Sequence, residues 1–213
     1  MPDQQTRELA MFPLGSVLFP HGSLPLHIFE IRYQKLLNHA LEAEREFGVV
    51  LITRGSEVGG GEERAEIGTI AKIQEYQRFD DGRAAVMSTG TKRFQVLEWL
   101  DDDPFPRATV RELEPEIVRA EDRDHLAIAH KSFDELLELG LRLGRLDSVP
   151  DSDWLTDVDD ASWQLAGRSP CSAHDQYSIL AAPTRVERLR KIDALLKDVY
   201  ADLELMGGMD APG

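Results

Sequence analysis

The sequence predicts a mixed α+β fold in which a strand-rich part precedes a helical part. Before Pro115, short apolar runs alternate with Gly and Pro, as in β-strands joined by turns. After Pro115, apolar residues recur at spacings of three and four, as on one face of an α-helix. Because strands and helices occupy separate parts of the chain, we expect two units, 7–115 and 118–208, rather than one alternating α/β sheet.

In the first part, the predicted strands are short and follow one another closely. A helix is expected over Arg32–Phe47, where the apolar residues share one face, with Gly48 at its C-cap. Asp80–Arg83 contains Asp-Gly, a hairpin signal. The expected strands are Met11–Leu14, Leu24–Phe29, Val49–Ile52, Ile67–Tyr76, Ala84–Thr89, Arg93–Leu97 and Ala108–Leu113. Short strands with one or two helices favour a small closed or half-open barrel over a sandwich.

In the second part, helix-start signals divide the chain. A helix is expected from about Glu121, and an acidic linker over Asp147–Asp160 precedes a short helix. Two further helix starts match the Ser/Thr-x-x-Asp/Glu pattern, which caps free N–H groups: Ser172 with Asp175 and Thr184 with Glu187.

The last helix carries an apolar seam with strict three-four spacing. Its members are Leu189, Ile192, Leu196, Val199, Leu203 and Met206. Such a seam is typical of a helix that packs against neighbouring helices. We therefore expect a bundle in which Leu189, Ile192, Leu196 and Val199 are buried against the helix around Phe133 and Leu137.

Composition excludes several classes of function. The formal net charge of -15 argues against nucleic-acid binding and against docking on anionic membranes. Cys171 is the single cysteine, so an intrachain disulfide is impossible and a thiolate zinc site is not expected. The first ten residues lack the apolar core of a signal peptide, and no apolar run approaches the ~18 residues of a membrane span. We expect a cytoplasmic protein.

Candidate catalytic and cofactor motifs each fail on residue type or spacing. The glycine-rich stretch 55–63 lacks Gly-Lys-Ser/Thr and ends in two glutamates, which would repel a phosphate. The aspartates of 151–159 lack the Gly and Glu of a calcium loop. Cys171, His174 and Asp175 have the residue types of a thiol hydrolase, but they fall within one turn at a helix start. We expect no enzyme activity, cofactor or metal.

The most promising binding residues are apolar and flank a Pro/Gly loop. Leu18, Phe19, His21 and Leu24 lie in or beside Pro20–Ser23, which must reach the surface. Exposed apolar patches commonly mark interaction sites, so we predict polypeptide binding here. Core packing around a turn is the competing interpretation of the same residues.

An ordered set of motifs resembles the N-terminal substrate-binding domain of Lon proteases. The strongest part is the opening, Phe12–Pro20 followed by Leu24–Glu30 and Arg32-Tyr33. Further matches are Phe47–Val50, Ile67–Ile73 and Gly90–Phe94, and Gln176–Leu180 with Arg188-Leu189 resembles the helical end. The likeness covers roughly residues 8 to 205.

The resemblance implies a PUA-like β-barrel followed by a small helical bundle. It also implies a module that binds unfolded or client polypeptides, without the ATPase and protease parts. Our leading hypothesis is therefore a polypeptide-binding module that serves as an adaptor or chaperone-like factor in proteolysis. An RNA-associated PUA-like protein is the alternative, and it requires a basic face. The available residues for that face are Lys72, Arg78, Arg83, Lys92, Arg93 and Arg107. A hydrolase with an unrecognised site is the third possibility. Client identity and oligomeric state are not encoded in any motif.

Overall fold

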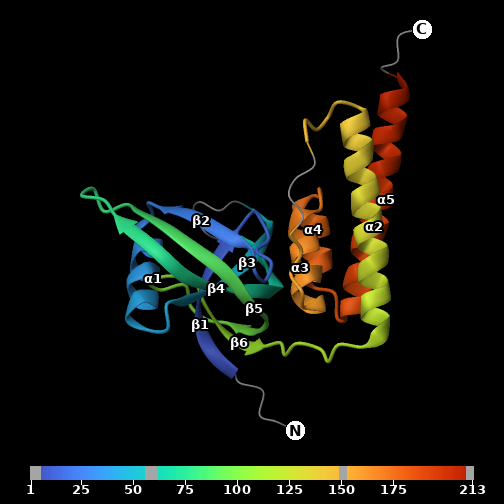
Figure 1. The fold of residues 1–213 in the computed structure, drawn as a ribbon. Helices are drawn as coiled ribbons and strands as arrows, with labels where there is room; N and C mark the ends of the chain where they lie inside the picture. The colour runs from blue at the N-terminus through green and yellow to red at the C-terminus, as the bar shows by residue number, and fades with distance from the viewer. Residues whose placement is uncertain (1–5, 56–61, 149–152, 210–213) are drawn as a thin grey trace. The chain divides into compact units, whose positions relative to one another are not determined.

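The computed structural model describes residues 6–55, 62–148 and 153–209, and the chain divides into two compact units at Pro115 (Figure 1). The first unit contains β1 (Thr6–Leu14), β2 (Ser23–Ile28), α1 (Ile31–Glu42), β3 (Glu46–Arg54), β4 (Glu63–Arg78), β5 (Ala84–Trp99) and β6 (Arg107–Glu112). The second contains α2 (Ala120–Arg142), α3 (Val158–Arg168), α4 (Ala173–Leu180) and α5 (Arg185–Met209).

All strands described in the first unit belong to one sheet, in the order β2-β5-β4-β3-β1-β6. An additional pairing joins β5 to β6, so the pairings β5-β4-β3-β1-β6 return to β5 and form a closed circuit. The β1–β3 pairing is parallel and the others are antiparallel. Strand β2 lies outside this circuit because β5 is its one partner among the described strands.

The predicted end of the helix and the predicted division of one strand into two were wrong. The helix ends at Glu42 rather than Phe47, because Arg45 adopts a positive φ of 62° and turns the chain into β3. The predicted strands Ala84–Thr89 and Arg93–Leu97 are one continuous strand, β5. Gly90, which falls between the two predicted strands, lies in the middle of the observed strand.

Glycine is required inside β5 by a close backbone approach. A Cβ at Gly90 would lie 2.2 Å from the carbonyl oxygen of Phe19, which is far inside van der Waals contact. Gly68, within β4, meets the same constraint, since its Cβ would lie 2.4 Å from the carbonyl oxygen of Val49. Both glycines therefore let a neighbouring segment pack directly on the strand.

Helix α1, the one helix among the described residues of the first unit, covers part of the sheet with one apolar face. Its buried residues are Tyr33, Leu36, Leu37 and Ala40. They belong to the core that also contains Phe12, Phe47 and Ile73. The Tyr33 ring stacks on Phe12 with centroids 4.1 Å apart, so α1 is fixed against β1 by an aromatic contact.

In the second unit, α2 and α5 lie side by side, and α3 and α4 flank one half of that pair (Figure 1). The seam residues Leu189, Ile192 and Leu196 are fully buried, as the spacing predicts. The prediction of burial fails at Val199, which is half-buried, and beyond it Leu203 is half-buried and Met206 is exposed. The reason is that α3 and α4 are shorter than α5 and do not cover its C-terminal half. None of the described helices is long and apolar enough to cross a membrane.

Burial of Leu196 gives a stability prediction. Leu196→Ala should lower the free energy of unfolding by about 2–5 kcal/mol, because it leaves a cavity in the α2–α5 contact. Leu205→Ala, at a position 71% exposed on the same helix, is the matched control and should change it by less than about 0.5 kcal/mol. Urea unfolding followed by far-UV circular dichroism measures both. Equal effects of the two variants would contradict the packing of this seam.

Candidate functional site

The open edge of β2 is the first candidate for a binding surface. Six residue pairs join β2 to β5, from Ser23–Thr89 to Ile28–Ala84. Gly90 N–H donates to the Gly22 carbonyl at 2.8 Å, so by the alternation of an antiparallel ladder the backbone groups of Ser23, Pro25 and His27 point away from β5. The free edge therefore offers three carbonyls but two N–H groups, because Pro25 has none.

Two cavities meet beside this edge. One, of about 200 Å³, lies between residues 12–14 of β1 and residues 25–30. The other, of about 380 Å³, lies between residues 27–29 and the β4–β5 hairpin, at Phe79, Arg83 and Ala84. Both are lined by Phe29, which is 59% exposed although it is a large apolar residue. We call the free edge of β2 together with Phe29, Tyr33 and Phe79 the β2-edge surface.

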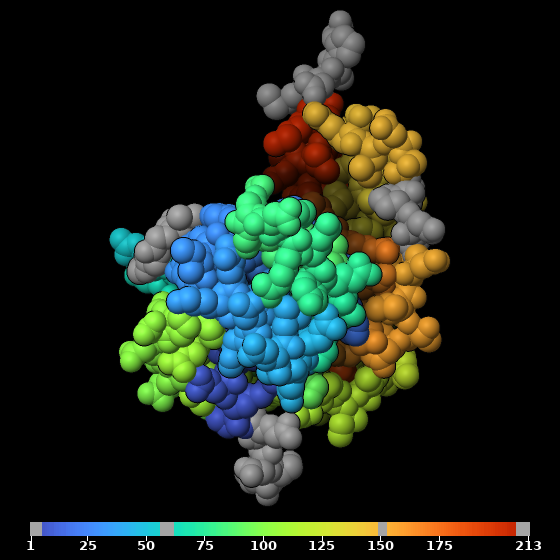
Figure 2. Space-filling view, turned by 90° about the vertical axis from the view of Figure 1, so that its left-hand side faces the viewer, coloured from blue at the N-terminus to red at the C-terminus, as the bar shows by residue number. Residues whose placement is uncertain are grey.

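The hairpin borders this surface with further apolar side chains. Figure 2 shows the tip of the β4–β5 hairpin, in green, against the blue surface formed by β2 and α1. The hydrogen bond from Arg78 Nη2 to Asn38 Oδ1 links the two. Tyr76, Phe79 and Met87 of the hairpin are all exposed by more than two fifths. Apolar side chains and open backbone groups therefore lie next to each other here.

Tyr33 supplies a polar group to the smaller cavity. Its side chain is buried, and its hydroxyl has no hydrogen-bond partner within the described part of the chain. Burial raises the pKa of Tyr33 to about 12, against the opposing effect of the adjacent Arg32. The hydroxyl is therefore a permanent donor at neutral pH. Buried polar groups are nearly always paired, so this unpaired hydroxyl is an unusual feature of the wall of the smaller cavity.

The apolar residues predicted as the binding site are placed differently from expectation. Leu18 and Phe19 are each only 5% exposed, so the expectation that they form accessible surface was wrong. The loop folds inward because Thr69 Oγ1 donates to the Leu18 carbonyl at 2.6 Å and His21 N–H donates to the Gly90 carbonyl at 2.8 Å. Their side chains are core, as in the competing interpretation. His21 is exposed, and Leu24 is half-buried in β2.

The exposed residue that sequence reasoning missed is Phe29. Leu24, Leu26 and Ile28 alternate along β2 and face inward. The next residue, Phe29, falls on the opposite side at the strand end. Adjacent apolar residues of β1 and β3 are buried on both faces of the sheet, so the local pattern alone does not distinguish Phe29 from a buried residue.

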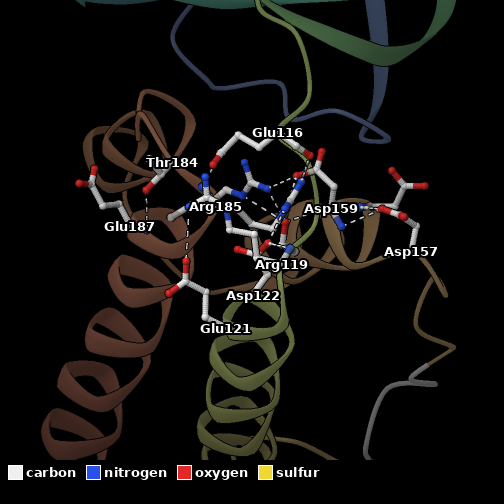
Figure 3. Close-up of polar contacts among 12 residues, drawn as sticks. Glu116, Arg119, Glu121, Asp122, Asp157, Asp159, Thr184, Arg185 and Glu187 are labelled. Carbon is white, nitrogen blue, oxygen red and sulfur yellow. Dashed lines mark hydrogen bonds and ion pairs between the residues drawn. The ribbon is translucent and has the colours of Figure 1, made fainter.

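The second unit contains a buried arginine cluster, shown in Figure 3. Arg185 and Arg188, from the first turn of α5, are each 1% exposed. Arg185 Nη1 donates to Asp122 of α2 at 2.8 Å, and its Nε donates to Asp159 of α3 at 2.9 Å. Its backbone N–H and Nη2 donate to Glu116, at 2.6 and 2.9 Å. One guanidinium thus joins the N-terminal ends of three helices.

Arg188 completes the cluster from the next position along α5. Its Nη2 donates to Asp159 at 2.5 Å and to Ser162 Oγ at 2.6 Å, and its guanidinium lies 3.5 Å from the centroid of the Trp163 ring. Burial alone would raise the pKa of Asp159, but the charges and hydrogen bonds of Arg188 and Arg185 outweigh it and hold that pKa below its usual range. Since these donors are used internally, the cluster stabilises the unit and does not present a ligand site.

The candidate nucleophile is deactivated by its surroundings. Burial, with a contribution from Asp175, raises the pKa of the Cys171 thiol, whereas a nucleophilic thiol needs a lowered one. The thiol donates to the Ser169 carbonyl at 3.4 Å, and Ser172 and Asp175 form the predicted helix cap. Within the described residues, no group of three or more His, Cys, Asp or Glu is arranged to hold a metal ion.

Two motifs discussed from the sequence fall partly outside the described residues. Positions 56–61 of the glycine-rich stretch and 149–152 of the acidic linker are not described. In the described part of the linker, Asp157 caps α3 by accepting from the N–H groups of Asp159 and Asp160. This capping agrees with the helix start expected there.

The basic residues considered for an RNA-binding face are mostly neutralised by nearby carboxylates. Four of them form ion pairs: Lys72–Glu46 at 3.4 Å, Arg83–Asp81 at 2.7 Å, Lys92–Glu112 at 2.9 Å and Arg107–Glu8 at 2.9 Å. Arg78 donates to Asn38. Phosphate binding would need a surface patch of unpaired positive charge, and these ion-paired side chains do not provide one.

The fold and the β2-edge surface define a mixed α+β module with an open strand edge. The chain belongs to the family of the substrate-binding domain of the ATP-dependent protease La (LON), which it matches over residues 8–198. A crystal structure of a Lon N-terminal domain protein from Xanthomonas campestris is similar, with 27% identity and a TM-score of 0.64, covering 88% of this chain and 98% of that one. The N-terminal domain of a Mycobacterium avium complex Lon protease shares the fold, with 17% identity and a TM-score of 0.66, over 90% of this chain and 99% of that one.

Longer relatives contain this region as one part. Lon protease 2 of Herpetosiphon aurantiacus is 26% identical over 213 residues, which is 94% of this chain and 25% of the relative. A LON peptidase N-terminal domain and RING finger protein of Schizosaccharomyces pombe is 25% identical over 51% of this chain and 25% of its own length. The chain spans a quarter or less of the length of the curated relatives it matches first.

The buried arginine cluster gives a pH-dependent prediction. Asp159→Asn should lower the free energy of unfolding at pH 7 by about 3 kcal/mol, because it leaves two buried guanidinium groups without their shared carboxylate. Since the folded pKa of Asp159 lies below its unfolded value, its contribution is complete above about pH 5 and is lost as the pH falls through the folded pKa. The difference between variant and wild type should therefore shrink below about pH 4.

Urea unfolding at a series of pH values tests this prediction. Asp124→Asn, which removes an exposed carboxylate from α2, is the control and should leave stability within about 0.5 kcal/mol of wild type at each pH. A constant difference between Asp159→Asn and wild type down to pH 3 would contradict the role given to this carboxylate.

Proposed function

We propose that this protein is a non-catalytic polypeptide-binding module that takes extended segments of unfolded clients on the β2-edge surface. A client strand would pair with the free carbonyls and N–H groups of β2 and place apolar side chains in the two cavities beside Phe29. Strand addition with alternate side chains in pockets is a common mode of peptide recognition.

The observation that carries the proposal is the exposure of Phe29 between two cavities and beside unpaired backbone. Exposed apolar residues that lie together commonly mark interaction sites, and Phe29 lines a cavity with the exposed Phe79. Backbone pairing does not depend on client sequence. Two members of the sequence-predicted set lie near this surface. His21 precedes β2, and Leu24 lies near the start of that strand. Membership in a substrate-binding family supports the same function.

The domain architecture, the cellular location and the role in proteolysis are part of the same proposal. We take the closed circuit of strands as the PUA-like β-barrel and the second unit as the helical bundle, with domains at 7–115 and 118–208. The module would act in the reducing cytoplasm, as an adaptor or chaperone-like factor for proteolysis. The RNA-associated alternative gains little support, because its basic residues are largely paired with carboxylates.

The test is a titration with a fluorescent, permanently unfolded client such as reduced, carboxymethylated lactalbumin. Phe29→Ser should weaken binding about tenfold, since it removes the apolar side chain shared by both cavities. Leu97→Ser is the matched control, because Leu97 is a comparably exposed apolar residue of the same unit that lines neither cavity. It should bind as wild type.

Two outcomes would contradict the proposal. One is equal client binding by wild type and a stably folded Phe29→Ser protein, and the other is tight binding of a structured RNA with no client binding. Repeating the titration at two salt concentrations adds a charge test. The net charge of -15 should favour basic clients at low salt only, because salt screens long-range attraction.

A further inference from the structure

A groove between α4 and α5 in the second unit is separate from the surface proposed above. Its volume is about 450 Å³. Ile179 of α4 is buried beneath it, and Leu195 and Val199 of α5 are half-buried in its wall. These apolar side chains lie where α5 extends beyond the part of it that packs against α4. A helix of 8 residues is about 12 Å long and one of 25 residues about 37 Å, so much of α5 has no α4 beside it.

The rim of the groove is acidic. Asp175, Asp198 and Asp202 line it, against a single lining cation, Lys191. Asp198 and Asp202 are both exposed, and in the part of the chain that the structure describes neither carboxylate forms an ion pair. Like charges four residues apart on a helix destabilise it, so a cation placed between them would relieve this repulsion.

The geometry of the groove suits a helix rather than an extended chain. The described elements of the second unit are all helices, so no strand edge is present in them to satisfy the backbone of an extended segment. A helix satisfies its own backbone and needs only an apolar stripe. The α5 side of the groove presents such a stripe, with lining residues at 191, 194, 195, 198, 199 and 202.

We propose that this groove docks an amphipathic helix of a partner protein whose apolar stripe is flanked by lysine or arginine. The stripe covers Leu195 and Val199, and the flanking cations pair with Asp198 and Asp202. A second copy of this chain is a poor occupant, because it carries the same net charge of -15. The helix partner is independent of unfolded clients and uses a different unit of the chain.

The experiment uses a defined peptide and the natural cysteine of the groove. The probe is an 18-residue helical peptide with leucines at three-four spacing and lysines on both flanks. Binding is measured by fluorescence anisotropy at low salt, and occupancy by the rate at which a maleimide modifies Cys171, which lines the groove and is the single cysteine of the sequence. We expect the bound peptide to slow that modification at least about fivefold, since docking covers the thiol.

Variants of the rim separate docking from general attraction to an acidic protein. Asp198→Asn/Asp202→Asn should weaken the peptide about fivefold at low salt, and this difference should fall below about twofold at 0.5 M salt. Asp124→Asn/Glu138→Gln makes the same change in net charge at exposed positions of α2 and should bind as wild type. Phe29→Ser should also bind the peptide normally, whether or not it binds unfolded clients.

Each of several results would overturn the inference. Equal binding of a scrambled peptide with the same composition would show simple charge attraction. Unchanged maleimide modification of Cys171 in the bound state would place the peptide elsewhere, as would loss of binding in Phe29→Ser alone. Concentration-dependent dimers that protect Cys171 without peptide would identify a second copy as the occupant.

Discussion

Strand β5 is held by three partners, and the first unit depends on this shared strand. Its first half pairs with β2, its second half pairs with β6, and β4 follows it along most of its length. Between the two halves, the carbonyl of Phe19 packs directly on Gly90, and the loop before β2 is hydrogen-bonded to the same residue. Because β5 closes the circuit of strands and also carries β2, one strand both completes the sheet and presents the open edge.

The two units offer apolar surface in different physical forms. On β2, the unsatisfied groups belong to the backbone, so a guest gains hydrogen bonds that do not depend on its sequence. In the α4–α5 groove, the backbone is internally satisfied, and selectivity rests on side-chain shape and on the carboxylates of Asp198 and Asp202. The first form suits diverse unfolded segments, whereas the second suits a partner with a particular pattern of residues.

The sequence predicts elements better than it predicts exposure. The α+β class, the capped starts of α4 and α5 and the buried part of the α5 seam follow from local patterns, since capping and periodicity depend on near neighbours. The burial of Leu18 and Phe19 does not, because it is set by Gly90 and Thr69, which lie more than fifty residues away. The incomplete burial of Val199 is equally nonlocal, since it depends on how far α4 extends along α5.

The buried pair Arg185 and Arg188 illustrates the same limit. Arginine at the start of a helix with polar neighbours resembles an ordinary solvated turn. The carboxylates that bury it come from Asp122 and Asp159, on two other helices.

Pro25 has a consequence for self-association that follows from its place on the free edge of β2. A fully unpaired edge is a template on which identical molecules stack into a growing sheet. With one donor missing at its centre, this edge forms an incomplete ladder with any strand, and the defect is repeated at every added copy. A short guest can align on the His27 side of the gap and avoid it, whereas a repeating assembly meets the gap at each layer. The proline therefore disfavours fibre growth but still allows short segments to bind reversibly at the edge.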